Sequence, residues 1–334
     1  MRFGLALPHY DFSLPPERRP ITFAASAEVA AEAERLGFDS VWVSDHFLYH
    51  FGRYGEPEPV YGSLEPLTTI AGVAALTERV RLGTLVLGAP FRHPSLLAKA
   101  VATLDSISAG RIDLGVGAGW LRDEFEAFGY RFGSVGERFA SLEETMQVLE
   151  ALFGGGEVSG TFGGVTLRSA RPLPPPVQRP GPPVWVGGKG GPRLLRLAAR
   201  HADGWNLVWR TAPERYADKV DDVARACEAE GRDPGTFRRS VGLYGLIAED
   251  AASVASLWER ARRSMPGRAL DAESWEDWRA DTLSGTPDQV LDRVAEFEAL
   301  GVEELILSPW SLPFALPEPE MLHVVAERVI APLR

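Results

Sequence analysis

The chain has 334 residues, 45% of them hydrophobic, and its one cysteine excludes a disulfide framework and a cysteine-rich metal site. Its formal net charge of -11 argues against a nucleic-acid-binding surface but allows a small anionic ligand at a local site. No apolar segment is long enough to span a bilayer, and no cleavage pattern follows a basic start. We therefore expect a cytoplasmic protein, without a membrane partner, that acts on a small molecule.

Short apolar runs alternate with amphipathic stretches along the whole chain, a pattern typical of a parallel α/β fold. Eight runs are predicted as strands: residues 2–7, 40–43, 81–87, 111–116, 184–186, 204–207, 239–247 and 304–308. Helices are predicted between them at residues 23–36, 98–106, 136–153, 194–201, 213–231 and 287–300. Eight such pairs close naturally, so the predicted fold is an α/β, (β/α)8 TIM barrel that forms one domain over residues 1–334.

Three segments are longer than a bare barrel needs, and we predict them to be insertions: residues 49–63, 154–183 and 264–284. The first follows the second strand, so it is expected on the face of the barrel that carries function. The second contains a predicted hairpin and follows a helix, which indicates an outer elaboration. The third follows the seventh strand and could form a lid, with a domain-swapped or interface element as the alternative.

Polar side chains follow the first two strands. The second strand ends in VWVSDHF, which places Asp45 and His46 at the rim of the barrel. His46 can donate or accept a proton near neutral pH, and Asp45 can orient it or cap the turn; the alternative is a capped turn with a packed histidine. His9, after the first strand, is a candidate for substrate contact or a histidine that satisfies loop carbonyls. No HxH or HExxH spacing is present, so no metal site is expected.

Two glycine-rich loops each follow a strand and precede a helix. The first loop includes Gly117, Ala118, Gly119 and Trp120. The second loop includes Gly187, Gly188, Lys189, Gly190 and Gly191, and Pro192 then opens a helix. Free backbone amides in such loops can bind a phosphate, although each loop alone could be a tight turn. Together the loops favour one phosphorylated cofactor.

Other residues have less distinctive patterns. Trp120, Trp205 and Trp209 follow strands or a glycine loop and could line a flat ring system, or they could simply pack. Glu65 is predicted to cap a helix, and Arg138 is predicted to be structural.

The ordered motifs VWVSDHF, GTLVLGAP, GVGAGW, EFEAFGY and VWVGGKGGPRLLRLAARHADGWN give the chain a family resemblance. It resembles the bacterial luciferase-like flavin and deazaflavin oxidoreductase superfamily, and is most similar to members that use the deazaflavin coenzyme F-420 (F420). The resemblance covers roughly residues 1–250 and, more loosely, the last strand and helix.

The resemblance implies several site features. It places the ring of F420 (8-hydroxy-5-deazaflavin) at the carboxyl face of the barrel, beside Asp45 and His46, with the phosphate on the two glycine loops. It also implies a cis peptide bond between Leu85 and Val86 under the ring, and a homodimer. Sugar-phosphate dehydrogenases of the family have a glutamate where this chain has Trp120, which puts sugar-phosphate oxidation in doubt.

Three functional hypotheses follow. The leading one is an F420-dependent oxidoreductase that transfers a hydride between the cofactor and a small organic substrate, with His46 as proton donor or acceptor. The second is an FMN-dependent luciferase-like monooxygenase that uses reduced flavin and oxygen and a separate reductase. The third, from another class, is a non-catalytic barrel that binds a phosphorylated ligand.

Overall fold

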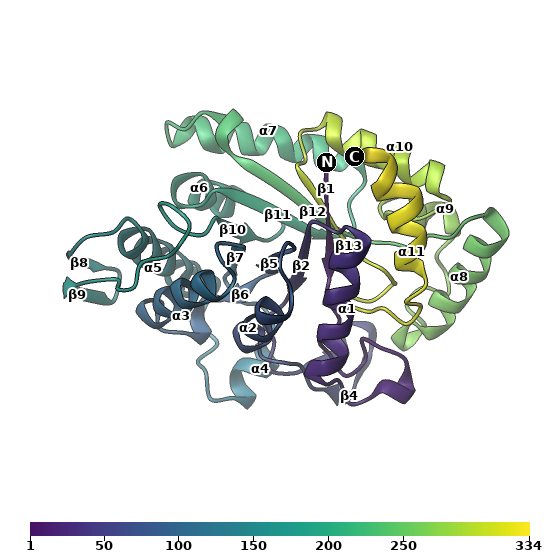
Figure 1. Ribbon diagram of the computed structural model, residues 1–334, viewed down its shortest axis with the longest axis horizontal. Coiled ribbons are helices and arrows are strands. Elements are labelled where there is room, and N and C mark those ends of the chain that lie inside the picture. The colour runs from purple at the N-terminus through teal and green to yellow at the C-terminus, as the bar shows by residue number, and fades with distance from the viewer.

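Eight parallel strands form a closed barrel in the computed structural model, which describes residues 1–334 (Figure 1). They are β1 (Arg2–Ala6), β2 (Ser40–Val43), β5 (Arg81–Thr84), β7 (Ile112–Gly117), β10 (Val184–Gly187), β11 (Gly204–Trp209), β12 (Arg238–Tyr244) and β13 (Glu304–Ser308). Pairing of β13 with β1 and of β10 with β7 closes the sheet. The predicted (β/α)8 TIM barrel is confirmed.

The strands differ from the prediction mainly at their ends. The apolar run at residues 81–87 is interrupted: β5 ends at Thr84, and a two-residue strand, β6 (Leu87–Gly88), pairs separately with the end of β7. The run at 239–247 ends earlier, because β12 stops at Tyr244. Every residue of β7 and β13 is buried, as expected for parallel strands covered on both sides.

Eleven helices surround the barrel. They are α1 (Phe23–Leu36), α2 (Pro66–Leu76), α3 (Pro94–Ile107), α4 (Arg122–Ala127), α5 (Val135–Phe153), α6 (Pro192–His201), α7 (Pro213–Ala229), α8 (Ala251–Ser264), α9 (Trp275–Ala280), α10 (Pro287–Ala299) and α11 (Met321–Val325). Two of them, α4 and α9, lie at the carboxyl face of the barrel. Glu65 accepts a hydrogen bond from the Thr68 amide at the start of α2, as predicted for a cap. None of these helices has the length and apolarity needed to cross a membrane.

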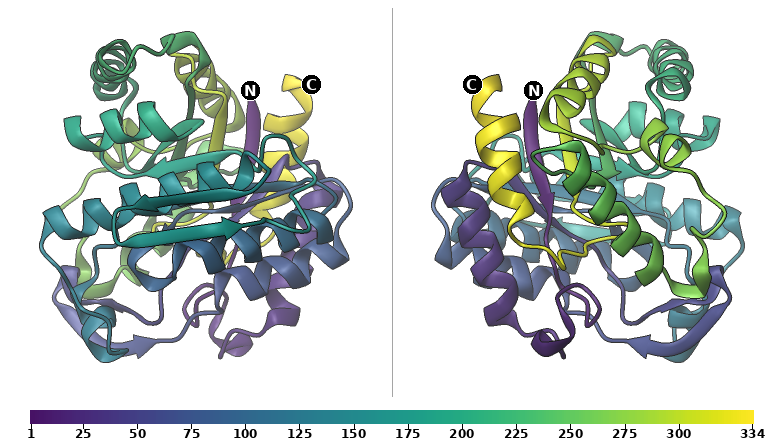
Figure 2. Two further views of the ribbon diagram at one scale, coloured as in Figure 1. Left: turned by 90° about the vertical axis from the view of Figure 1, so that its left-hand side faces the viewer. Right: turned by 90° about the vertical axis from the view of Figure 1, so that its right-hand side faces the viewer.

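The three insertions have different structures. The first is a hairpin of β3 (Tyr49–Phe51) and β4 (Glu56–Tyr61). The second contains the predicted hairpin, β8 (Val158–Phe162) with β9 (Val165–Ala170), which lies on the outside against α5 (Figure 2). The third contains α9.

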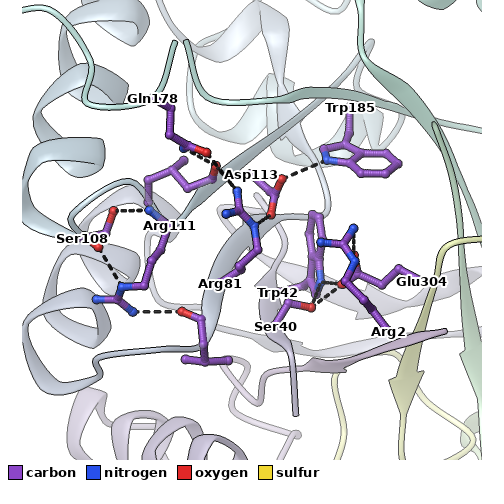
Figure 3. A network of polar contacts seen from close by, with 12 residues as sticks. Arg2, Ser40, Trp42, Arg81, Ser108, Arg111, Asp113, Gln178, Trp185 and Glu304 are labelled. Carbon is purple, nitrogen blue, oxygen red and sulfur yellow. Dashed lines mark hydrogen bonds and ion pairs between the residues drawn. The ribbon is translucent and has the colours of Figure 1, made fainter. Parts of the chain in front are cut away.

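A buried polar network closes the amino-terminal end of the barrel (Figure 3). Nε of Arg81 donates to Asp113 over 2.5 Å, and the Trp185 indole donates to the same carboxylate over 3.3 Å. Glu304, the first residue of β13, lies 2.8 Å from the guanidinium of Arg2. Burial raises the pKa of Glu304, and Arg2 opposes that shift. These charges are paired at the end of the barrel opposite the predicted site.

Candidate active site

The segments that follow β1, β2, β7 and β10 lie at the carboxyl ends of the strands, and those after β2 and β7 include β4 and α4 at the lower edge of Figure 1. Val116 pairs with Val186 in the register of β7 and β10, so the two glycine loops leave neighbouring strands. The structure therefore brings the two predicted loops together with the end of β2. Parallel barrels carry function at this face.

His46 is held by a carboxylate from a distant part of the chain. Its Nδ1 lies 3.0 Å from both side-chain oxygens of Glu124 on α4. The Glu124 side chain is 1% exposed and also accepts a hydrogen bond from the Phe47 amide over 3.0 Å. A carboxylate only accepts, so Nδ1 carries a proton, and Nε2 has no hydrogen-bond partner within the protein. The imidazole is 12% exposed.

Asp45 does not orient His46, and that part of the prediction is wrong. Its carboxylate accepts a hydrogen bond from the Gly88 amide over 2.9 Å and forms a two-pronged ion pair with Arg92. Arg92 in turn lies 2.7 Å from Glu65. Burial alone would lower the pKa of Arg92, but its bonds to Asp45 raise it. Asp45 thus anchors β6 to the end of β2.

His9 is fully buried and both of its ring nitrogens have partners. Nδ1 lies 2.7 Å from the Leu7 carbonyl oxygen, and Nε2 lies 3.0 Å from the Ser44 hydroxyl, which also contacts the Tyr10 hydroxyl. Burial lowers the pKa of His9 to about 4, although the bond to Leu7 raises it. His9 is therefore neutral at pH 7, and its contacts favour the alternative of a histidine that satisfies loop groups over direct contact with a substrate.

The peptide bond between Leu85 and Val86 is cis, as expected from the resemblance. A second non-prolyl cis bond, Val208–Trp209, was not expected. The Val86 side chain lies between the two glycine loops: a Cβ atom at Gly117 would be 2.6 Å from Cγ2 of Val86, and one at Gly187 would be 2.6 Å from Cγ1. These two glycines are thus required by the packing of Val86.

The two glycine loops leave a set of backbone amides without an acceptor inside the protein: Ala118, Gly119, Trp120, Lys189, Gly190 and Gly191. Gly191 is the N-cap residue of α6, and nothing lies within 4 Å of the position of a Cβ atom there. Gly188 differs, because its amide already donates to the Asn206 carbonyl over 3.1 Å. The Gly188 amide is therefore not free to donate to a phosphate, while the free amides fit an anion at the start of α6.

The three candidate tryptophans occupy different environments. Trp120 is exposed and lies edge-on to His46, with ring centroids 5.6 Å apart. Trp205 is fully buried beneath the second loop and donates to the Gly188 carbonyl, so it packs and does not line the site. Trp209, at the end of β11, stacks on Tyr244 with ring centroids 5.5 Å apart.

The first and third insertions meet over this face. A Cβ atom at Gly267, before α9, would be 1.9 Å from the Tyr54 carbonyl oxygen. Arg53 interacts with Tyr244: burial alone would lower the pKa of Arg53, but Tyr49 and Tyr244 raise it. The third insertion is packed within its own chain here, with Trp278 stacked on Tyr244 and 1% exposed.

A separate cavity lies away from this face. It has a volume of about 550 Å³ and is bounded by Phe153, the Gly154–Gly156 turn and Arg179. It shares no residue with the surroundings of His46, and its two lining arginines already bind Glu157 and the Pro176 carbonyl. The candidate site is defined by the convergence of side chains and free amides, not by this cavity.

Glu124 is the main site residue that the sequence interpretation missed. Glu124 is the first residue of the EFEAFGY motif. That motif contributes to the family resemblance, but the sequence assigned no function to Glu124. The signal was an acidic residue just after a strand-terminal glycine loop, and therefore at the same face as His46. Exposed helix acids give the same local pattern, so only the fold identifies the pair.

Comparisons with known proteins agree with this architecture. A family model described as luciferase-like monooxygenase matches residues 1–304. The F420-dependent glucose-6-phosphate dehydrogenase of Amycolatopsis mediterranei (strain U-32) is 36% identical over 305 residues, which cover 84% of this chain and 86% of that protein. The phthiodiolone/phenolphthiodiolone dimycocerosates ketoreductase of Mycobacterium tuberculosis (strain ATCC 25618 / H37Rv) is 28% identical over 366 aligned positions, with 93% of each chain covered.

Two solved structures match over nearly the whole chain. Monooxygenase RslO1 from Streptomyces bottropensis has a TM-score of 0.76 and 26% identity, with 100% of both chains covered. An F420-dependent secondary alcohol dehydrogenase in complex with an F420-acetone adduct has a TM-score of 0.76 and 19% identity, with 99% of this chain and 98% of that chain covered. The second likeness supports the fold alone.

Proposed function

We propose that this chain, which belongs to the luciferase-like monooxygenase family, is an F420-dependent oxidoreductase that transfers a hydride between coenzyme F420 and a small organic substrate. The observation that carries the proposal is the His46–Glu124 pair beside the two glycine loops. The relative from Amycolatopsis mediterranei, named as F420-dependent, supports the choice of cofactor.

The free amides of the two loops would hold the cofactor's phosphate. Those of Lys189, Gly190 and Gly191 lie at the start of α6, where the helix dipole favours a negative charge, and Lys189 is exposed beside them. Val86 would support the ring, because its side chain separates the two loops at the centre of the carboxyl face. When bound, a deazaflavin supplies or accepts a hydride, and the protein must then supply or accept a proton.

His46 is the group for that proton. Glu124 keeps Nδ1 protonated and stabilises the positive charge that His46 gains when Nε2 takes up a proton. With an alcohol as substrate, Nε2 of the neutral imidazole accepts the hydroxyl proton. With a ketone as substrate, Nε2 of the protonated ring donates a proton to the carbonyl oxygen. Glu124 acts through His46 and is a positioning residue.

Parallel titration of the purified protein with F420 and with FMN, each oxidised and reduced and followed by fluorescence, tests the cofactor assignment. Selective binding of F420 is the expected result, and selective binding of FMN would contradict it. The second result would favour the FMN-dependent monooxygenase, which the 26% identity to RslO1 keeps as the second candidate. The third hypothesis, a non-catalytic barrel that binds a phosphorylated ligand, predicts that the cofactor binds but that alcohols and ketones are not turned over.

The role of His46 needs a separate test. Replacement by alanine should leave the affinity for F420 nearly unchanged and lower turnover about 100-fold to 10,000-fold, the usual contribution of proton transfer. Unchanged turnover would remove His46 from the mechanism. The expected homodimer stays a proposal as well, and sedimentation of the purified protein tests it.

A further inference from the structure

We propose that the substrate of this enzyme is an uncharged, apolar alcohol or ketone, and that the indole of Trp120 binds its apolar part next to His46. This inference rests on the proposed function, because it assigns the substrate class of the same site. Three features of the carboxyl face support it: the exposure of Trp120, the aromatic surroundings of His46 and the pairing of the nearby arginines.

Trp120 is the only one of the nine tryptophans that is exposed, with 53% of its surface accessible. An exposed indole beside a reactive group is unusual, because burial of so large an apolar ring stabilises a fold and exposed apolar surface often marks a binding site. The ring lies edge-on to His46 at an interplanar angle of 80°. The indole of Trp120 therefore places apolar surface directly beside the imidazole of His46.

The backbone holds Trp120 in this position. Gly119 has a φ of +73°, a conformation that favours glycine, and a Cβ atom there would be 2.7 Å from Phe125. Nε of Arg138 donates to the Gly119 carbonyl over 3.2 Å. The backbone at Gly119 is thus held in one conformation by the Phe125 ring and by Arg138. The exposed position of the Trp120 side chain follows from this constrained backbone.

His46 is surrounded by uncharged rings. Its centroid lies 5.5 Å from that of Tyr49, 5.6 Å from that of Trp120 and 6.3 Å from that of Tyr10. Burial raises the pKa of Tyr49 to about 12 and raises the pKa of Tyr10 well above its ordinary value, so both phenols are neutral at pH 7. A substrate that approaches His46 meets aromatic surface on several sides.

The arginines that border this face already have partners. Arg92 pairs with Asp45 and Glu65, and Arg210 pairs with Glu273 and Asp281. Arg122, at the start of α4, pairs with Glu126. Arg138 and Arg53 bind neutral groups and keep their charge: Arg138 donates to the carbonyls of Gly119 and Gly133, while Arg53 interacts with Tyr244. Lys189 and the start of α6 belong to the proposed cofactor site. A substrate phosphate near His46 would therefore have to compete with buried or partly buried carboxylates for Arg92 and Arg210.

Two matched probes test the substrate class: acetophenone, and 4-acetylphenyl phosphate, which is the same ketone with an added dianion. The rate at which each ketone is reduced is measured from the oxidation of reduced F420. The binding of each ketone is measured by calorimetry with and without F420. We expect binding and reduction of acetophenone, with kcat/KM at least about tenfold higher than for the phosphorylated ketone. Equal or better use of 4-acetylphenyl phosphate would overturn the proposal.

Variants at Trp120 test the contact. Trp120→Ala should weaken acetophenone binding about tenfold and raise KM similarly, because it removes a ring contact and its buried area, while Trp120→Phe should retain most of the affinity. Leu76→Ala, an exposed apolar residue at the end of α2, is the control and should change neither. Unchanged acetophenone affinity in Trp120→Ala would overturn the contact. Failure to bind F420 would instead contradict the proposed function, and calorimetry without the cofactor would still report the substrate class.

Discussion

The Glu124 carboxylate lies 3.0 Å from Nδ1 of His46, although the two residues are 78 positions apart in the chain. Glu124 lies on α4, a six-residue helix after β7, and His46 lies three residues after the end of β2. Because the carboxyl ends of all the parallel strands lie at one face of the barrel, residues that follow β2 and β7 meet although β5 lies between these strands. The contact gives the proposed proton-transfer residue a defined tautomer.

Replacement of Glu124 by glutamine should lower kcat about 100-fold, the lower end of what proton transfer contributes, because the neutral amide stabilises a charged imidazole less. Cofactor affinity and KM should change little, since Glu124 touches neither ligand in the proposed site. Steady-state kinetics with fluorescence titration of F420 measure both. Asp123→Asn is the control: Asp123 binds His50 at the surface and should be nearly silent. A loss of F420 affinity in Glu124→Gln equal to its loss of kcat would contradict the positioning role.

A negative charge at the start of α6 should weaken cofactor binding. Gly191→Asp places a carboxylate where we expect the phosphate, in a backbone conformation (φ −69°, ψ 155°) that any residue adopts. Both aspartate and asparagine are good N-cap residues, so neither variant should lower thermal stability. We expect the Kd for F420 to rise about tenfold or more in Gly191→Asp, from charge repulsion, and much less in Gly191→Asn. Equal affinities in the two variants would place the phosphate elsewhere.

The buried, neutral state of His9 predicts an acid-sensitive stability. Its pKa is lowered from 6.5 to about 4 in the folded protein, so the unfolded chain binds more protons between these values. The stability that the folded protein gains from a neutral His9 is fully present above pH 6.5, and it is lost as the pH falls from 6.5 toward 4. It corresponds to about 2 kcal/mol less stability at pH 5 than at pH 7.

Denaturant unfolding at pH 5 and pH 7 measures this contribution. His9→Gln removes the titrating group, so the stability of the variant should fall by about 2 kcal/mol less than that of the wild type over the same interval. The absolute stability of the variant at pH 7 is not the readout, because the substitution also alters the contact with Leu7. An identical pH dependence in both proteins would show that His9 does not titrate as described.

The ion pair between Asp45 and Arg92 should be structural. Asp45→Ala leaves a mostly buried guanidinium without its main partner, and we expect the free energy of unfolding to fall by about 3 kcal/mol. Glu65→Gln removes the second, 44% exposed partner of Arg92 and should cost less than about 1 kcal/mol. Urea unfolding compares the two variants. A silent Asp45→Ala variant, with intact stability, would show that β6 is held without this pair.

Much of the architecture followed from local patterns. Strand β2 and helix α1 were predicted to the residue, because an apolar run bounded by turn residues and an amphipathic helix with a terminal glycine are encoded over short distances. The place of His46 at the functional face also followed, since strands that alternate with helices are parallel and end at one side. The family resemblance further supplied the Leu85–Val86 cis bond.

The amino-acid sequence by itself therefore determined the barrel, the end of the barrel at which the candidate site lies, and the loops and side chains found at that end. Only the tertiary structure decided the partners: Asp45 turns to Gly88 and Arg92, and Glu124 takes the place beside His46. It also showed that Gly117 and Gly187 accommodate Val86. The physical reason is that pattern and propensity describe neighbours along the chain, whereas hydrogen bonds and steric contacts in a barrel join segments that closure alone brings together.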